Sequence, residues 1–383
     1  MTQAIPRPDY PRPQFVRDAW VNLNGPWTYT LDPGKSGMER SFQSSAGFDG
    51  EIIVPFCPES RLSGIGHTDF IECMWYQRTL PVPAAWQGQR ILLHFGGVDY
   101  ECEAFIDGRS VGRHYGGTVS FTFDITAYVE PGRTHNLVLY VHDDTRHSHQ
   151  PGGKQSMRYA SHNCHYTRTT GIWQTVWLEA VHPHGIQSVQ IVPDLDGERF
   201  IVTPTFHAVR RGLSFRARVA HESEVIGQKT VAAASGVPCV LELAGIGLRP
   251  WSPEDPFLYD LSFEVVDETG ETLDYVESYA GLRKVHIEGN QVYLNNEPIY
   301  LRLVLDQGFY PDGIWTAPDD AALRRDIELS MAAGFNGARL HQKVFEERFH
   351  YWADRLGYLT WGESSSWGLD VKEPISARNF LGE

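Results

Sequence analysis

Polar and aromatic side chains follow three apolar segments in the last quarter of the sequence. These residues are Asp306 after the first segment, Arg339 and His341 at the end of the second, and Trp361 and Glu363 at the end of the third. A guanidinium group offers a planar fork of donors that fits a carboxylate, and an imidazole can bond a hydroxyl group. Polar side chains directly after buried strands are hard to explain as core, so we interpret this set as a candidate binding site. The alternative is a group of mutually satisfied ion pairs at the rim of a sheet.

The elements that must position these side chains have the strand–helix alternation of an α/β unit. Residues 299–305, 335–341 and 358–361 predict strands, the first as a near-continuous apolar run typical of a parallel strand covered on both faces. Between the strands, an apolar stripe with i, i+4, i+8 spacing predicts a helix that stops at Gly334, and a second apolar face predicts one that stops at Gly357. This pattern is the start of a (β/α) barrel or of an open α/β sheet.

The residues before this unit have the pattern of many short β-strands separated by turns, in a sequence with 36 glycines and 23 prolines. We therefore predict a multidomain fold that is mostly β and then α/β. A jelly-roll β-sandwich is expected over residues 1–182 and an immunoglobulin-like β-sandwich of about seven strands over residues 183–286. The α/β unit then occupies residues 287–383.

Composition excludes several classes of partner. A net charge of −15 argues against nucleic acid and anionic membranes, because an acidic surface repels both. No apolar run reaches the roughly 18–20 residues that span a bilayer. The N-terminus lacks the pattern of a signal peptide, and the five scattered cysteines form no CxxC pair, so we expect a cytoplasmic protein. Five histidines between residues 142 and 168 fit no standard metal-ligand spacing, and we expect neither a metal nor another cofactor.

Six short motifs occur in the order in which glycoside hydrolase family 2 has them. They lie at residues 20–27, 75–78, 95–114, 171–179, 251–256 and 279–283; the fourth, Gly171-Ile172-Trp173-Gln174-Thr175-Val176-Trp177-Leu178-Glu179, is the most specific. The sequence therefore resembles the N-terminal portion of this family, which includes β-galactosidases, β-glucuronidases and β-mannosidases. Within the motifs, we expect Trp20, Trp27, Trp75 and Trp177 to be core anchors rather than sugar platforms.

The resemblance implies a sugar-binding-type first domain and the first three βα units of a TIM (β/α)8 barrel at residues 287–383. It also implies retaining hydrolysis of β-linked O-glycosyl bonds, which needs two carboxyl groups about 5–5.5 Å apart. In the family, the acid/base glutamate follows an asparagine at the end of strand four, and the nucleophile glutamate ends strand seven. This sequence supplies strand ends one to three. We therefore expect both glutamates to lie beyond Glu383 and the 383-residue chain to be inactive.

By the same resemblance, the five residues singled out above are substrate-binding residues at the sugar subsite, with Trp361 either stacking on a sugar or packing in the core. The expected partner is an oligosaccharide or another glycoside. Family members often form dimers or larger assemblies, so a homo-oligomer is also expected, with no symmetry fixed by the sequence. The alternative hypothesis is a non-catalytic carbohydrate-binding or assembly protein that kept the front domains of such an enzyme.

The loop before Gly171 carries two further candidates. In the family this loop reaches toward the barrel mouth, so Lys154 and Arg168 could touch the substrate. The segment Gly152-Gly153-Lys154 only faintly resembles a phosphate-binding loop, because it lacks the preceding glycine and the strand–helix context. An unrelated jelly-roll binding module fused to a small α/β domain is a third hypothesis, which the well-formed barrel units disfavour.

Overall fold

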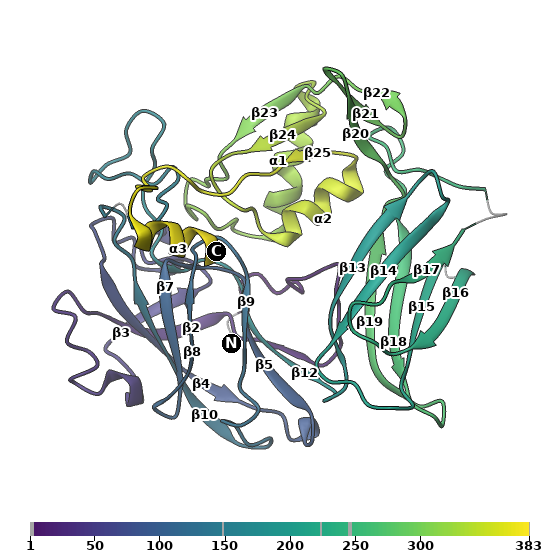
Figure 1. The fold of residues 1–383 in the computed structure, drawn as a ribbon. Helices are drawn as coiled ribbons and strands as arrows, with labels where there is room; N and C mark the ends of the chain where they lie inside the picture. Colours follow the sequence, from purple (N-terminus) through teal and green to yellow (C-terminus); the bar gives the residue numbers. More distant parts are fainter. Residues whose placement is uncertain (1–3, 148, 223, 244–246, 383) are drawn as a thin grey trace.

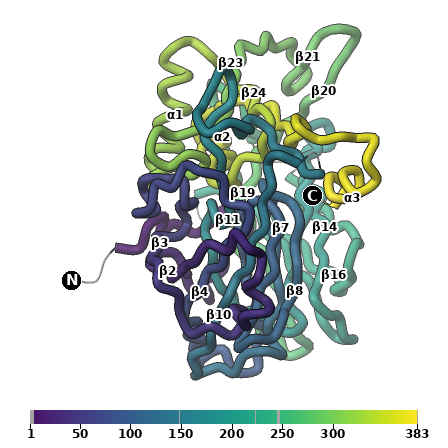
Figure 2. The backbone as a smooth tube through the Cα atoms, turned by 90° about the vertical axis from the view of Figure 1, so that its left-hand side faces the viewer, coloured from purple at the N-terminus to yellow at the C-terminus, as the bar shows by residue number. Residues whose placement is uncertain are grey.

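The protein folds into three bodies that touch one another (Figure 1). The structure is a computed structural model and describes residues 4–147, 149–222, 224–243 and 247–382. A first β-sandwich and a second β-sandwich lie side by side, and a smaller α/β unit lies across one end of both. The view from the side in Figure 2 also places α1 and α2 at one end of the molecule, beyond the strands of the first sandwich.

Two antiparallel sheets and a shared apolar core form the first sandwich. The four-stranded sheet has the order β1 (Trp20–Asn22), β12 (Val176–Val181), β5 (Arg90–Phe95), β9 (Phe121–Asp124). The six-stranded sheet has the order β3 (Gly50–Val54), β2 (Gly25–Leu31), β4 (Cys73–Pro81), β10 (Thr134–His142), β7 (Glu101–Ile106), β8 (Arg109–Tyr115). A short pair, β6 (Val98–Asp99) with β11 (Gly171–Ile172), and three 3-10 turns, η1 (Phe42–Ser44), η2 (Arg61–Ser63) and η3 (Ala84–Trp86), complete it.

Large aromatic side chains anchor this body. Trp27, Trp75 and Trp177 are buried, which confirms them as structural anchors. Trp20 is only half-buried and packs edge-on against Tyr10. Two packed antiparallel sheets agree with the predicted sandwich, and the jelly-roll connectivity stays a prediction.

The second sandwich packs a three-stranded sheet on a four-stranded sheet around aromatic and aliphatic residues. The first sheet has the order β13 (Ile186–Asp194), β14 (Arg199–Phe206), β17 (Cys239–Glu242), and the second has the order β16 (Glu224–Ala232), β15 (Ser214–His221), β18 (Tyr259–Val266), β19 (Thr272–Ala280). A small sheet of β20 (Val285–Glu288), β21 (Gln291–Leu294) and β22 (Glu297–Pro298) leads into the α/β unit. The immunoglobulin-like assignment stays a prediction.

The α/β unit has a parallel sheet of β23 (Leu303–Asp306), β24 (Gly337–Leu340) and β25 (Leu359–Trp361). Helices α1 (Asp320–Ala332) and α2 (Glu347–Leu356) connect the strands, and α3 (Pro374–Gly382) follows the third. Asp319 caps α1 by accepting from the Ala322 N–H at 2.8 Å. The strand–helix alternation agrees with the expectation; its membership in a barrel stays a prediction.

The first strand of the α/β unit begins later in the sequence than the predicted range, residues 299–305. The observed strand begins at Leu303, and Tyr300 is 78% exposed. Residues before it are held by the side chain of Asn336, which donates to the Tyr300 carbonyl at 2.9 Å and accepts from the Arg302 N–H at 2.8 Å. A side chain therefore satisfies backbone groups that a neighbouring strand would otherwise pair.

The N-terminal segment joins the three bodies. Val16 pairs with Glu277 beside the second sandwich, and the side chains of Asn22 and Asn24 in the first sandwich donate to the Arg7 carbonyl. Arg7 in turn forms an ion pair with Glu346 at 2.6 Å, just before α2.

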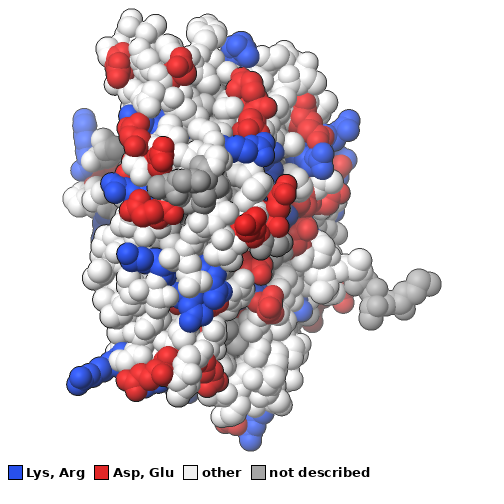
Figure 3. Space-filling model, turned by 90° about the vertical axis from the view of Figure 1, so that its right-hand side faces the viewer, with Lys and Arg blue, Asp and Glu red and all other residues white. Residues whose placement is uncertain are grey.

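Acidic and basic side chains are interspersed on the face that Figure 3 shows, so the net charge is not gathered there into one patch. Within the described chain, no helix is both long and apolar enough to cross a membrane.

Candidate functional site

Three of the five predicted site residues meet at the carboxyl ends of β24 and β25. Glu363 accepts a close hydrogen bond from Arg339 Nε and a second one from His341 Nδ1 at 2.7 Å. The backbone N–H of Gln342 donates to the same carboxylate at 3.2 Å. Parallel neighbouring strands bring their carboxyl ends to one edge, which is why residues 22 and 24 positions apart in sequence can meet.

This arrangement keeps Glu363 ionised. Burial would raise the pKa of Glu363, but hydrogen bonds from His341, Arg339 and the Gln342 N–H outweigh it and lower the pKa below the ordinary value. An ionised carboxylate accepts hydrogen bonds and repels anions. Glu363 is therefore suited to binding a hydroxyl group or orienting a cation, and unsuited to donating a proton.

Asp306 has different surroundings. Its carboxylate accepts from the Gly308 N–H at 2.8 Å, and its backbone carbonyl accepts from the His341 N–H at 2.7 Å. Burial raises the pKa of Asp306, and the Gly308 hydrogen bond and the charge of Lys343 oppose this rise. The structure thus places Asp306 beside the cluster but turned toward the loop after β23.

Lys343 is a buried lysine that the sequence did not predict as a site residue. Its Nζ donates to the Gly308 carbonyl at 2.6 Å. Four aromatic rings surround this Nζ with centroids 4.8–5.7 Å away: Phe345, Trp173, Trp315 and Phe309. Burial lowers the pKa of Lys343 to about 7, although the negative charges of the nearby Asp306 and Glu346 oppose this shift. The signal in the sequence that could have identified Lys343 is its place two positions after His341, at the end of the same strand.

Trp361 lies on the open face of the sheet rather than in the cluster. In the strand register, Leu305, Arg339 and Trp361 are direct neighbours, and each is at least half exposed. The opposite face is the one that packs on α1 and α2, through residues such as Leu340 and Phe349. Trp361 therefore shares a face with Arg339 and stays a candidate for ligand stacking.

The loop before Gly171 does reach the cluster, but its two candidate residues are buried. Arg168 donates to the carbonyls of Ser156, Arg158 and Thr68, so it holds the loop together and does not face the site. Lys154 is also buried, and its ammonium lies 3.2 Å from the centroid of the Trp367 ring. The structure thus does not bring Arg168 to the cluster: it is 2% exposed and three of its N–H groups are bonded to carbonyls within and beside the loop, and contact of Arg168 with a substrate stays a prediction.

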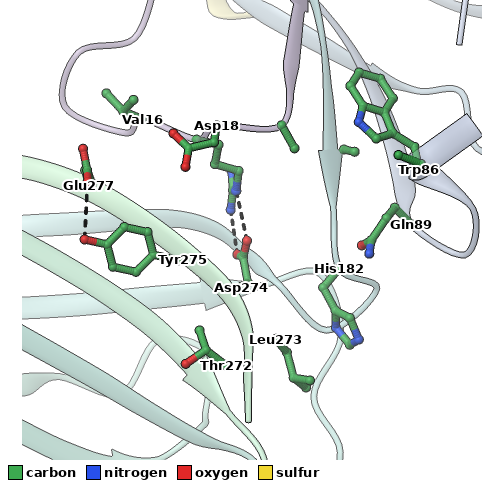
Figure 4. Close-up of a pocket in the computed structure, with 14 residues that line it drawn as sticks. Val16, Asp18, Trp86, Gln89, His182, Thr272, Leu273, Asp274, Tyr275 and Glu277 are labelled. Carbon is green, nitrogen blue, oxygen red and sulfur yellow. Dashed lines mark hydrogen bonds and ion pairs between the residues drawn. The ribbon is translucent and has the colours of Figure 1, made fainter. Parts of the chain in front are cut away.

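A cavity of about 340 Å³ lies elsewhere, between the two sandwiches (Figure 4). Its walls come from the N-terminal segment, the first sandwich and β19, and include Trp86, His182 and Tyr275. Asp274, which is ion-paired there, and the surrounding residues are distinct from the predicted site. Within the described chain, no three His, Cys, Asp or Glu side chains are placed to hold a metal ion.

Comparisons with known proteins cover both sandwiches. Residues 68–180 match the family model "Glycosyl hydrolases family 2, sugar binding domain", and residues 185–283 match "Glycosyl hydrolases family 2". The chain is 25% identical to a β-glucuronidase of Paenibacillus borealis over 94% of this chain and 61% of that protein. It is 26% identical to a β-galactosidase of Thermoanaerobacter pseudethanolicus over 91% of this chain and 46% of that protein. The chain thus spans less than two thirds of the length of these relatives.

A solved structure has the same fold. The β-glucuronidase from Ruminococcus gnavus in complex with D-glucuronic acid matches with a TM-score of 0.83, over 98% of this chain and 65% of that chain. Sequence identity is 19%, so this similarity concerns the fold alone.

Proposed function

Because the chain belongs to glycoside hydrolase family 2 and corresponds to its N-terminal portion, we propose that it is the substrate-binding portion of an enzyme that acts on β-linked glycosides by retaining hydrolysis. The substrate class is a β-glucuronide or a β-galactoside, the activities in the names of the relatives. Residues 287–383 are proposed to be the first βα units of a (β/α)8 barrel. The observation that carries the proposal is the Arg339–Glu363–His341 cluster at the carboxyl ends of adjacent parallel strands.

We assign this cluster to substrate binding rather than to bond cleavage. Retaining hydrolysis needs two carboxyl groups about 5–5.5 Å apart, one as acid/base and one as nucleophile. Glu363 is held ionised by its donors, while Asp306 is turned to Gly308. The proposed reaction therefore takes its carboxylate pair from residues other than these, and Glu363 orients Arg339 and His341 toward the sugar.

A non-catalytic carbohydrate-binding protein is the second candidate, and the same observation favours it: a polar cluster can bind a sugar without cleaving it. Binding and turnover separate the two candidates. We expect calorimetric titration of the 383-residue chain with methyl β-D-glucuronide or methyl β-D-galactoside to give binding that Glu363→Gln weakens about tenfold or more, because the charged hydrogen bonds of the cluster are lost. Failure of both glycosides to bind the wild-type chain would refute the proposed site.

Turnover of aryl β-glycosides is measured on the same samples. We expect none from the 383-residue chain. Clear turnover that Glu363→Gln abolishes would contradict the assignment of the carboxylate pair to other residues.

A further inference from the structure

A half-exposed tryptophan borders the polar cluster. Trp367 lies four positions after Glu363, and its ring meets the ring of His341 edge-on with centroids 6.0 Å apart. The imidazole of His341 is the same one that donates to Glu363. Trp367 is 42% exposed, so part of its ring is open to solvent next to the cluster.

Lys154 covers one face of this ring. Its ammonium lies 3.2 Å from the ring centroid, and only 4% of Lys154 is exposed. A cation held over an indole face is attracted by the ring and fixes its orientation. The ring of His165 also contacts Trp367, with centroids 5.8 Å apart and an interplanar angle of 48°. The exposed surface of Trp367 is therefore the part of the ring that Lys154 and His165 leave open.

The Gly152-Gly153-Lys154 segment is built for this contact. The backbone N–H groups of Gly152 and Gly153 donate to the Trp367 carbonyl at 2.8 and 3.2 Å. Gly153 has φ +55°, and an added Cβ would lie 2.6 Å from the Gln342 carbonyl oxygen. Only glycine allows so close an approach in this conformation.

Gln342 holds residues 365–367 from the side opposite to Gly152 and Gly153. Its Oε1 accepts from the N–H groups of Ser366 and Trp367, each at 2.9 Å, and its carbonyl accepts from Ser365 Oγ at 2.8 Å. Gln342 itself is buried and has a positive φ of 58°. The first sandwich and the α/β unit thus clamp the backbone of Trp367 from both sides.

We propose that the exposed face of Trp367 is a platform for a pyranose ring of the glycoside, and that Lys154 is a positioning residue that fixes this platform. The inference rests on the proposed function and adds a subsite to it. A pyranose presents one face of C–H groups, which pack on an aromatic face, while its hydroxyl groups reach the polar side chains around the ring. The indole then contacts Lys154 on one face and the sugar on its exposed part.

Titration of single variants of the 383-residue chain with methyl β-D-glucuronide and methyl β-D-galactoside tests the platform. We expect Trp367→Ala to weaken binding about tenfold and Trp367→Phe to retain most of it, because stacking needs a ring. Tyr300→Ala is the matched control, since Tyr300 is a more exposed aromatic at the opposite end of β23. Unchanged affinity in Trp367→Ala, with binding by the wild-type chain, would overturn the platform and leave the proposed function intact. Wild-type binding to neither glycoside would refute the proposed function and the platform together.

Lys154→Met and Lys154→Arg test the positioning role. We expect the methionine variant to bind the glycoside several-fold more weakly at an unchanged unfolding midpoint, and the arginine variant to restore affinity, because only the latter keeps a cation over the ring. The indole N–H resonance of Trp367, assigned by its loss in Trp367→Phe, should shift or broaden in Lys154→Met. An unaltered resonance and unaltered affinity would overturn the role of Lys154.

Discussion

Two buried carboxyl groups lie behind the loop that carries Lys154. Glu59 is 3% exposed; its Oε2 accepts from the Thr170 N–H at 3.1 Å, and its Oε1 has no hydrogen-bond partner among the described residues. Asp143 accepts from Thr170 Oγ1 at 3.0 Å and from Gln150 Nε2 at 2.7 Å. Burial raises the pKa of Glu59 to about 8 and that of Asp143 to about 7, despite these donors. In the folded protein, Glu59 therefore keeps its proton up to about pH 8 and Asp143 keeps its proton up to about pH 7.

Replacing Glu59 with glutamine should change how stability depends on pH. The folded state keeps the Glu59 proton between the ordinary carboxyl pKa of 4.5 and about 8, so stability falls as pH rises through this range. Relative to wild type, Glu59→Gln should gain on the order of 3 kcal/mol between pH 5 and pH 8.5, at about 1.4 kcal/mol per unit of pKa shift. Urea unfolding of both proteins at both pH values measures this difference. Equal pH dependence in the two proteins would contradict the assignment.

At the scale of elements, α2 connects the α/β unit to the second sandwich. Asp354 near its end accepts from Tyr279 Oη at 3.2 Å and from Arg283 at 2.9 Å, and the Asp354 carbonyl accepts from Trp251 Nε1 at 2.6 Å. Gly357 then ends the helix with φ +77°, and an added Cβ would lie 2.4 Å from the Pro253 carbonyl oxygen. Gly357 therefore ends α2 and also allows the α/β unit to approach the Pro253 backbone of the second body closely.

Gly357→Ala and Gly334→Ala separate these two roles. Gly334 follows α1 with φ +93° and has nothing within 4 Å of an added Cβ. We expect Gly334→Ala to cost about 1 kcal/mol of unfolding free energy from backbone strain alone. Gly357→Ala should cost about 1–3 kcal/mol more, because its methyl group must displace the Pro253 backbone. Chemical denaturation measures both; equal losses would show that the contact with Pro253 adjusts freely.

Local patterns predicted the elements better than the contacts between them. Gly334 and Gly357 end the predicted helices, because glycine readily adopts the left-handed backbone conformation that terminates a helix. Arg339, His341 and Glu363 could be expected to lie close together, because the carboxyl ends of neighbouring parallel strands lie at the same edge of a sheet. Lys343 and the clamp on Trp367 were missed, because their partners lie in loops whose approach no local pattern encodes.

At the scale of the whole molecule, Arg17 connects the two sandwiches. It donates to Asp274 of β19 at 3.1 and 2.8 Å, to the Ile186 carbonyl at 2.6 Å and to Glu179 of β12 at 3.4 Å. Burial alone would raise the pKa of Glu179, but Arg12, His94 and Arg17 lower it to about 2. Figure 4 shows the ion pair at Asp274 in the wall of the cavity between the sandwiches.

Arg17→Gln should destabilise the protein by about 3–5 kcal/mol, because it leaves the buried carboxylate of Asp274 without its ion-pair partner, whereas Glu179 keeps Arg12. Arg199→Gln is the control: its ion pair with Asp194 lies within the second sandwich and is solvent-accessible, so water screens it and we expect a much smaller loss. Thermal unfolding followed by circular dichroism compares the two variants. Similar losses would indicate that the junction of the sandwiches tolerates an unpaired carboxylate.

The N-terminal segment also constrains the order of events on the ribosome. Arg7 leaves the exit tunnel early, yet its partner Glu346 is 339 positions later. At about 5–20 residues per second, the nascent chain waits roughly 20–70 seconds before this contact can form. Until then the Arg7 guanidinium lacks its acidic partner, although Asn22 and Asn24 can already hold the Arg7 carbonyl on the first sandwich. The contact between the N-terminal segment and α2 is therefore made only late in the synthesis of these residues.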